Sequence, residues 1–193
     1  MTVDIRVATG DLFADVASLL APAKPTPHAC WCLSYRVRPA DFHELTDEQK
    51  PALLHTLCER EVAPGLIAYV DGEPAGWCGF GPRADVERFR ASKTILPIDD
   101  LPVWSIICFV VTPRFRGRGL ARELLNAAVD YARDQGAPAV EGYPVDPGEK
   151  RIGAGAAFVG TTALYESAGF TRMGETAAKT AGLPRWIMRR ATS

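Results

Sequence analysis

The sequence predicts one domain of mixed α/β class, and three features carry that prediction. Apolar runs of strand length alternate with amphipathic helical segments along the chain. The run 104–111 is apolar at seven of its eight positions, which is typical of a strand buried on both faces near the centre of a sheet. No segment has the length or composition of a linker, so residues 1–193 are expected to form a single domain.

The first 40 residues contain three expected elements. Residues 3–8 alternate apolar and polar side chains, which predicts a strand. Apolar side chains at helical spacing then predict a helix over residues 11–20. Three prolines in residues 21–27 prevent that helix from continuing, so this segment is expected to be a loop. A short strand is expected over residues 30–37.

The middle of the chain carries clear turn and cap signals. Thr46-x-x-Gln49 resembles a capping box, and a helix is expected to follow it. Asp71-Gly72 joins two apolar runs, a pattern that predicts a β-hairpin over residues 65–80. A short helix is expected around residues 86–90.

The second half repeats strand and helix. The strand 104–111 passes through an Arg/Gly stretch into an amphipathic helix over residues 120–134, which Gly136 and Pro138 end. The remaining elements are expected to be a strand at 139–145, a Gly-rich insertion to about residue 154, a helix through Tyr165 stopped by Gly169, and strands at 170–174 and 185–190.

Composition and charge exclude several classes of protein. Net charge is −1, so no global field attracts the chain to nucleic acid or to a membrane. No apolar run approaches the ~20 residues that span a bilayer, and the first residues lack a secretory signal. The five cysteines form an odd, scattered set, which favours reduced thiols. A cytoplasmic location is therefore expected.

The bend between the central strand and its helix has the composition of a phosphate site. The first N–H groups of a helix lack intrahelical acceptors and lie at the positive end of its dipole. Gly117 and Gly119 let the backbone approach an oxygen without interference from a Cβ. Four guanidinium groups add charge beside them: Arg114, Arg116, Arg118 and Arg122. This set suits a pyrophosphate, and the alternatives are a solvated basic turn or an RNA-binding segment.

Two motifs here resemble the GNAT superfamily of N-acetyltransferases. The run Arg114-Phe115-Arg116-Gly117-Arg118-Gly119 fits the coenzyme A signature Gln/Arg-x-x-Gly-x-Gly/Ala, and the pattern fits again two residues later. The late signature of the family, an aromatic residue and small residues before Gly-Phe, is similar to residues 164–170, Leu-Tyr-Glu-Ser-Ala-Gly-Phe. The resemblance covers the C-terminal half well. It implies a mixed, mostly antiparallel twisted sheet flanked by helices.

The resemblance also implies a donor substrate and its site. Acetyl-CoA would be the cosubstrate, with no metal, and its acetyl group would pass directly to a primary amine. In this family the strand before the phosphate turn separates from its neighbour and leaves main-chain groups for the pantetheine arm and the thioester oxyanion. Carried onto this chain, the coenzyme A site comprises Phe109, Val110, Val111, Arg114, Arg116, Gly117, Arg118, Gly119, Leu120, Ala121 and Arg122.

Tyr165 stands where the family often places the general acid that protonates the leaving thiolate. A phenol with its ordinary pKa of about 10 is protonated at neutral pH and can donate. The alternative is a buried aromatic side chain on an amphipathic helix. The chain departs from the family at Phe158, where many members have asparagine, so the contacts of that asparagine are either lost or supplied by another residue, with Thr161 and Thr162 as candidates.

The sequence does not identify which group is the general base. Candidates are Asp99 and Asp100 before the central strand, Glu141 on the next strand, or a chain of water molecules. Cys108 is not expected to carry a covalent intermediate, because no activating histidine accompanies it.

Three alternatives concern other functions. The side chains of His28, Cys30, Cys32, His55 and Cys58 are metal-ligand types, but their spacing does not fit structural zinc. A non-catalytic acyl-CoA-binding sensor would share the phosphate loop. A nucleic-acid-binding protein would use the arginines, but the net charge of −1 argues against this alternative. The acceptor and the acyl-chain preference are open, and a homodimer is compatible with the resemblance.

Overall fold

The computed structural model describes residues 1–24, 26, 29–150, 152–153 and 157–193. In these residues seven strands form one sheet of order β1-β2-β3-β4-β5-β7-β6, in which only β4 and β5 are parallel neighbours. The mixed, mostly antiparallel sheet is therefore confirmed. The strands are β1 (Val3–Val7), β2 (Gly65–Val70), β3 (Glu73–Pro82), β4 (Trp104–Val111), β5 (Ala139–Gly142), β6 (Thr171–Thr180) and β7 (Leu183–Ala191).

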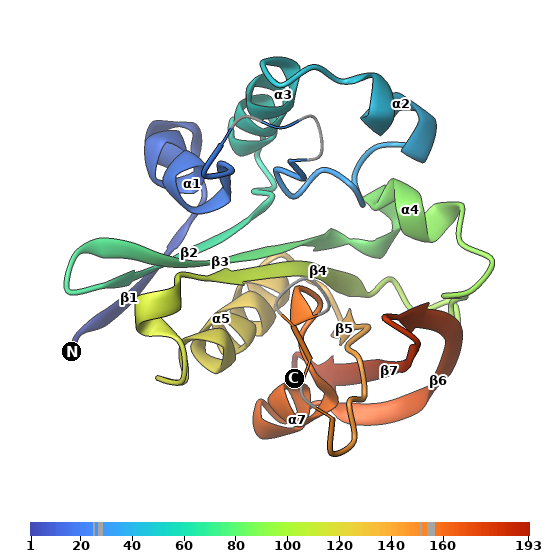
Figure 1. The fold of residues 1–193 in the computed structure, drawn as a ribbon. Helices are drawn as coiled ribbons and strands as arrows, with labels where there is room; N and C mark the ends of the chain where they lie inside the picture. The colour runs from blue at the N-terminus through green and yellow to red at the C-terminus, as the bar shows by residue number, and fades with distance from the viewer. Residues whose placement is uncertain (25, 27–28, 151, 154–156) are drawn as a thin grey trace.

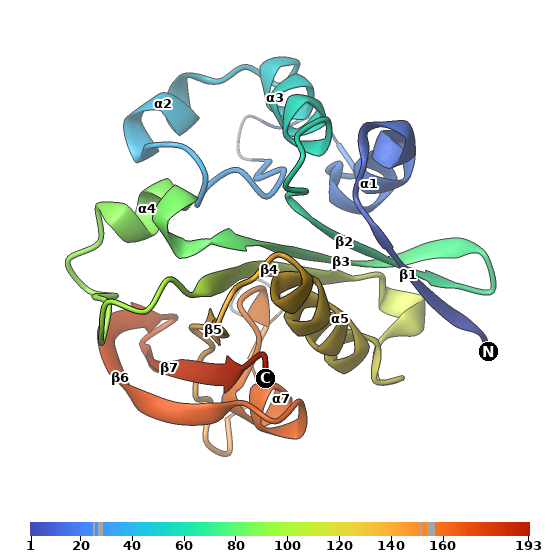
Figure 2. The same cartoon turned by 180° about the vertical axis from the view of Figure 1, so that it is seen from behind.

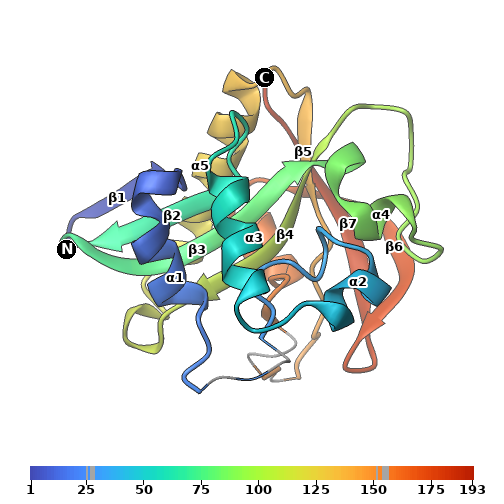
Figure 3. The ribbon, with the colours of Figure 1, turned by 90° about the horizontal axis from the view of Figure 1, so that it is seen from above.

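Helices cover both faces of this sheet (Figure 1, Figure 2). On one face lie η1 (Gly10–Leu12), α1 (Phe13–Leu20), α2 (Pro39–Glu44), α3 (Gln49–Cys58) and α4 (Glu87–Arg90), with η2 (Arg83–Asp85) before α4. On the other lie α5 (Leu120–Asp134) and α7 (Thr162–Ser167), and η3 (Pro113–Phe115) joins β4 to α5. Figure 3 shows α1 and α3 across the first face, with α4 toward β6 and β7.

Each face of the sheet has its own apolar core. The first core packs α5 and α7 against the sheet and includes Leu124, Leu125 and Tyr165. The second packs α1, α3 and the segment 29–37 against the opposite face and includes Trp77 and Cys32. The central strand contributes to both cores, because successive side chains of a strand point to opposite faces.

Local sequence signals account for several of these elements. Asp71 and Gly72 take positive φ angles of 50° and 85° in the β2–β3 turn, as an Asp-Gly hairpin turn requires. The capping box is also present: the Thr46 N–H donates to Gln49 Oε1 at 2.9 Å, and the Gln49 N–H donates to Thr46 Oγ1 at 3.2 Å. The helix α5 begins and ends at the predicted residues.

Strands β4 and β5 separate soon after they meet. Their register joins Trp104 to Val140 and Ser105 to Glu141, and β5 ends at Gly142 while β4 continues to Val111. On its other side β4 has a bulge, because the register with β3 shifts between Gly79 and Phe80. The far half of β4 therefore leaves its β5-side edge open to other groups.

The predicted strand over residues 30–37 is wrong, because this segment forms successive turns. Trp31 and Cys32 have φ angles of 47° and 56°, in the left-handed region that a strand does not use. The sequence analysis also missed α2. It placed the end of β5 three residues too late, and it made β6 too short. The loop expected at 21–27 lies partly outside the described residues.

Candidate active site

The bend between β4 and α5 has the backbone of an anion site. Gly117 and Gly119 have φ angles of 72° and 81°, which glycine adopts without the strain of a Cβ. Gly119 is the N-cap of α5, so the N–H groups of Leu120 and Ala121 begin the helix without intrahelical acceptors. The buried Phe115 and Leu120 side chains anchor the bend, while residues 116–119 are exposed.

The arginines of the bend are held along its surface. Arg114 forms an ion pair with Glu73, and its guanidinium lies 4.5 Å from the centre of the Phe115 ring. The Arg118 guanidinium lies 5.7 Å from the same ring. Arg116 Nε donates to the Val111 carbonyl at 3.0 Å. The bend therefore concentrates positive charge at the N-terminus of α5, although the net charge of the chain is −1.

Two cavities follow this bend and share lining residues. The first, about 520 Å³, lies against the bend and the α7 residues Leu164 and Ser167. The second, about 530 Å³, lies along Phe109 and Val110 of β4 and reaches Phe158. Both are lined by Val111, Arg116, Ala121 and Leu164, so the two spaces lie side by side. Together they form a groove from the start of α5 down the open edge of β4.

Tyr165 lies beside this open edge. Its side chain is fully buried, and within the described residues its hydroxyl has no hydrogen-bond partner. The ring packs edge-on against Phe109 and Phe170, with centroid separations of 6.3 and 5.0 Å. It also covers Gly142, the last residue of β5. Burial raises the pKa of the phenol well above its ordinary value, so the hydroxyl keeps its proton at neutral pH.

The Phe109 N–H group, one of the main-chain donors expected at the thioester, already has an acceptor. It donates to the Phe158 carbonyl at 2.6 Å. Phe158 therefore closes the groove at the point where β4 and β5 separate. Thr161 Oγ1 accepts the Leu164 N–H at 3.3 Å and caps α7, so that oxygen is engaged within its own helix.

The candidate carboxylates differ in their surroundings. Glu141 is 2% exposed and accepts hydrogen bonds from Tyr143 Oη at 2.7 Å and from Arg189. Asp99 receives two bonds from the same Arg189 guanidinium, at 2.6 and 2.9 Å, and these lower the pKa of its carboxyl. Asp100 is exposed. Two of the three candidates are thus engaged by one arginine.

Two arginines outside the sequence-based predictions, Arg185 and Arg36, make long-range hydrogen bonds in the interior. Arg185 is buried, donating from Nε to the Tyr143 carbonyl at 2.7 Å and from Nη1 to Tyr35 Oη at 3.0 Å. Arg36 donates from Nη2 to the carbonyls of Pro64 and Phe80. These partners lie far apart in the chain, and no local pattern links them.

The side chains of metal-ligand type do not come together as one group in the described residues. Across the residues that the structure describes, no three His, Cys, Asp or Glu side chains could hold a metal ion. His28 lies outside those residues. All five cysteines are free thiols, with Cys30 exposed and Cys32 buried.

With the site described, similarity to known proteins defines its class. The sequence model described as the acetyltransferase (GNAT) family matches residues 31–170. The chain therefore belongs to the GNAT acetyltransferase family. The predicted class, an acetyl-CoA-dependent acyltransferase, is confirmed.

Solved structures with the same fold include several acetyltransferases. One called simply an acetyltransferase has a TM-score of 0.61 at 20% identity and covers 98% of this chain and 100% of its own. The aminoglycoside acetyltransferase AAC(6')-Ib with coenzyme A has a TM-score of 0.56 at 21% identity, covering 98% and 95%. An N-acetyltransferase from Staphylococcus aureus Mu50 has a TM-score of 0.57 at 13% identity, covering both chains fully. A comparison with curated proteins found no match.

Within the described residues, none of the helices combines the length and the apolar character needed to cross a bilayer.

Proposed function

We propose that residues 1–193 act as one N-acetyltransferase domain that moves the acetyl group of acetyl-CoA directly onto a primary amine. In this proposal the pyrophosphate of coenzyme A binds the bend 116–122, and the pantetheine arm follows the groove along Phe109, Val110 and Val111. The structural support is the pair of neighbouring cavities that lie along these two segments and share four lining residues.

The single observation that carries the catalytic proposal is the buried, unpartnered hydroxyl of Tyr165. Buried polar groups nearly always have a hydrogen-bond partner, and an orphan costs about 1–3 kcal/mol. The hydroxyl lies beside Gly142, where β5 ends, and the ring packs against that of Phe109 on β4. A thioester sulfur in this gap would be its partner, and Tyr165 would protonate the thiolate as it leaves.

The oxyanion would be held by the main chain of β4. A thioester oxygen that replaces the Phe158 carbonyl at the Phe109 N–H would take over an existing, aligned donor. Such a donor typically contributes about 3–4 kcal/mol to transition-state stabilisation. Binding of acetyl-CoA then requires the segment around Phe158 to move away from β4.

The bend between β4 and α5 supplies positive charge and unpaired N–H groups together. The N-terminus of α5 carries roughly half a positive charge and attracts a diphosphate without further help. Arg116 and Arg118 add charge on the exposed side of the bend. This pairing of backbone donors with guanidinium groups fits a pyrophosphate better than a neutral ligand.

Substitution of Tyr165 tests the catalytic part of the proposal. Tyr165→Phe keeps the ring that packs against Phe109 and Phe170 but removes the acid. We expect kcat to fall about 10²-fold or more, with acetyl-CoA affinity little changed. The measurement is release of free coenzyme A thiol with an amine panel of benzylamine, lysine and kanamycin, alongside calorimetric titration. Turnover at the wild-type rate would remove Tyr165 from the mechanism.

A second candidate function has one observation in its favour. The Phe158 carbonyl on the Phe109 N–H closes the groove, which fits a protein that binds acyl-CoA without transferring the acyl group. The same assay separates the two functions. Calorimetric binding of acetyl-CoA, with no thiol release above background for any amine of the panel, would favour a sensor.

A further inference from the structure

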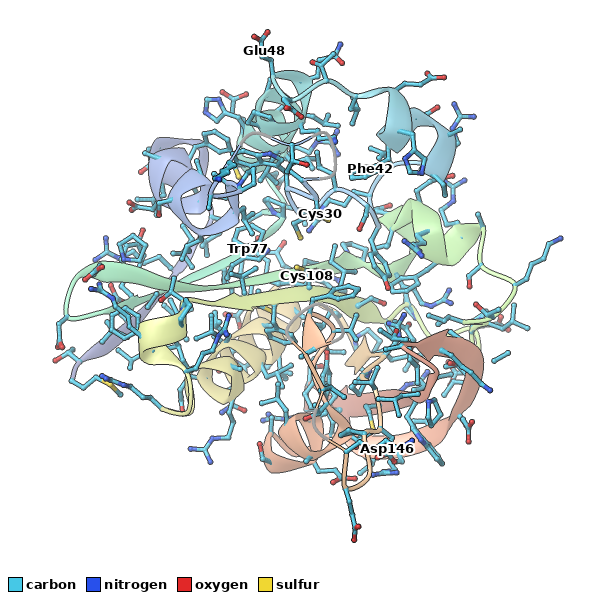
Figure 4. All side chains as sticks on the ribbon, viewed as in Figure 1. Cys30, Phe42, Glu48, Trp77, Cys108 and Asp146 are labelled. Carbon is cyan, nitrogen blue, oxygen red and sulfur yellow. The ribbon has the colours of Figure 1, made fainter. Side chains whose placement is uncertain are left out.

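Cys32 and Cys108 meet on the face of the sheet opposite Tyr165. Cys108 pairs with Gly79 in the β3–β4 register, and the Cys32 sulfur occupies the space over Gly79 that a side chain would fill. The left-handed backbone of Cys32 directs its sulfur there. Figure 4 shows Cys108, Trp77 and Cys30 together between the sheet and the α1–α3 layer.

Two buried N–H donors, on Arg36 and Trp77, lie near Cys32. Within the described residues, Arg36 Nε and Trp77 Nε1 are buried and have no acceptor at full hydrogen-bond geometry. Trp77 Nε1 lies 3.1 Å from the Cβ position that Gly79 lacks, next to the Cys32 sulfur. A neutral thiol is a poor acceptor, whereas a thiolate accepts from several donors at once. The arrangement therefore favours an ionised Cys32.

The groups around Cys32 support the same charge state. The Cys108 thiol on β4, acting as a donor, lowers the pKa of Cys32 to about 6 together with the charge of Arg36 and the Trp77 donor, although burial acts in the opposite direction. The neighbouring Cys32 and burial raise the pKa of Cys108 well above its usual value. Burial also raises the pKa of Cys58 on α3, to about 11, and that of Cys78 on β3. Among these four thiols, Cys32 is therefore the one that ionises most readily.

The thiol pair lies directly behind the groove. A small cavity of about 10 Å³ is lined by Cys32, Cys108, Tyr35 and Phe158. Phe158 lines the groove as well, so it separates the two spaces. When the Phe158 carbonyl leaves the Phe109 N–H, the thioester carbonyl that replaces it would lie one residue along β4 from Cys108.

We propose that the Cys32–Cys108 pair is the proton acceptor for the attacking amine, with Cys108 at the reacting atoms and the Cys32 thiolate behind it. This role rests on the proposed acetyl transfer. In this proposal neither Glu141 nor Asp99 is the base. Both already accept hydrogen bonds from Arg189.

The proton balance closes without another reactant. The amine nitrogen bonds to the thioester carbonyl carbon, and the carbon–sulfur bond to coenzyme A breaks. The surplus proton of the amine moves to the Cys108 sulfur as the proton of Cys108 passes to Cys32. Tyr165 gives its proton to the departing coenzyme A thiolate. The resulting tyrosinate regains a proton from the now neutral thiol pair or from solvent.

The first test measures the thiolate itself and needs no turnover. Ultraviolet difference absorbance of the thiolate, followed against pH, is expected to titrate at about pH 6 in the wild-type protein. The signal should vanish in Cys32→Ser and persist in the matched control Cys58→Ser, whose cysteine lies on α3 outside the small cavity. A wild-type protein without a thiolate below pH 8 would overturn the proposal.

The second test measures the proton transfer. Single-turnover thiol release with saturating acetyl-CoA and benzylamine or kanamycin should fall below about pH 6 in the wild-type protein. In Cys32→Ser the rate at pH values above about 6 should drop about 10²-fold or more, as expected for loss of a general base. The affinity for acetyl-CoA, measured by calorimetry, should stay within about twofold of the wild-type value. This result would show that the variant is folded.

A second variant covers the case in which Cys32→Ser does not fold. Cys108→Ser removes the thiol that lowers the Cys32 pKa most, so the acid limb should move above pH 6 as the rate falls. An unchanged rate and pH profile in either folded variant would overturn the thiol role alone. Absence of thiol release from wild-type protein that still shows the thiolate would overturn the proposed acetyl transfer, and with it this role.

Discussion

Gly142 at the end of β5 has no side chain, and the Tyr165 ring occupies the space where one would lie. A Cβ here would collide with the ring and with the hydroxyl. Both residues are buried, so neither can move into solvent to relieve the contact. The position of the proposed acid thus depends on the absence of one carbon atom in a neighbouring strand.

Gly142→Ala is expected to destabilise the protein and to displace Tyr165. Overpacking of a core typically costs about 1–3 kcal/mol, and the displaced hydroxyl should also reduce thiol release. Chemical denaturation and the release assay measure the two effects. The control is Gly174→Ala on β6, where an added Cβ would meet nothing within 4 Å. Equal stability of both variants would contradict the packing described for Tyr165.

The thiol pair gives the second example at the residue scale. Cys58 and Cys78 have raised pKa values because they are buried, whereas Cys32 is also buried and has a lowered one. Burial is therefore not the deciding effect at Cys32. The donors of Cys108, Arg36 and Trp77 outweigh it, which is why a substitution there should change reactivity as well as packing.

At the scale of elements, the bend between β4 and α5 depends on two positive φ angles. An alanine in the left-handed region is strained by about 1–2 kcal/mol relative to glycine. At Gly119 that strain acts on the N-cap of α5, which must keep its conformation for the first N–H groups to meet a phosphate. The geometry of this short element therefore sets the affinity of the donor site.

Gly119→Ala is expected to weaken acetyl-CoA binding about 5- to 30-fold, the equivalent of that strain. Calorimetric titration measures the change. Gly182→Ala is the matched control, because Gly182 has a φ of 77° in the β6–β7 turn and open space around it. It should carry a similar strain and leave the affinity unchanged. Equal losses in the two variants would show that the effect is general destabilisation.

The pairing of β4 with β5 at one end of the two strands is held by a defined set of hydrogen bonds. Arg189 on β7 bonds both to Glu141 on β5 and to Asp99 before β4. Glu141 faces Ser105 in the register, and Tyr143 Oη lies 3.2 Å from Ser105 Oγ. These buried contacts close the sheet at one end of the pair. The strands can then separate at the other end without loss of the sheet.

At the scale of the whole molecule, ligand binding and stability are coupled. A ligand that binds only the folded state at 100 times its Kd adds about 2.7 kcal/mol of stability. For a chain of this size each kcal/mol raises Tm by roughly 2–4 °C. Coenzyme A at that concentration is therefore expected to raise Tm by about 5–10 °C, measured by calorimetric scanning. An unchanged Tm would remove the donor site, and adenosine without phosphates is the control ligand.

The parts of the fold that the sequence predicted are those with local causes. The β2–β3 hairpin follows from Asp71-Gly72, and α5 follows from a glycine at its N-cap and an amphipathic pattern. The bend between β4 and α5 was predicted from glycines and arginines within one short segment. The failure at residues 30–37 has a non-local reason: apolar side chains suggested a strand, whereas the segment turns with positive φ angles at Trp31 and Cys32 and packs Cys32 over Gly79 of β3.

The sequence by itself determined the class of the protein, the glycine-containing bend before α5 and the helix that carries Tyr165, because each depends on residues close together in the chain. Only the tertiary structure decided that the Tyr165 hydroxyl is unpartnered, that Phe158 closes the groove, and that Cys32 meets Cys108, 76 residues away. The physical reason is that burial and charge state arise from packing between distant segments. No spacing within one segment encodes them.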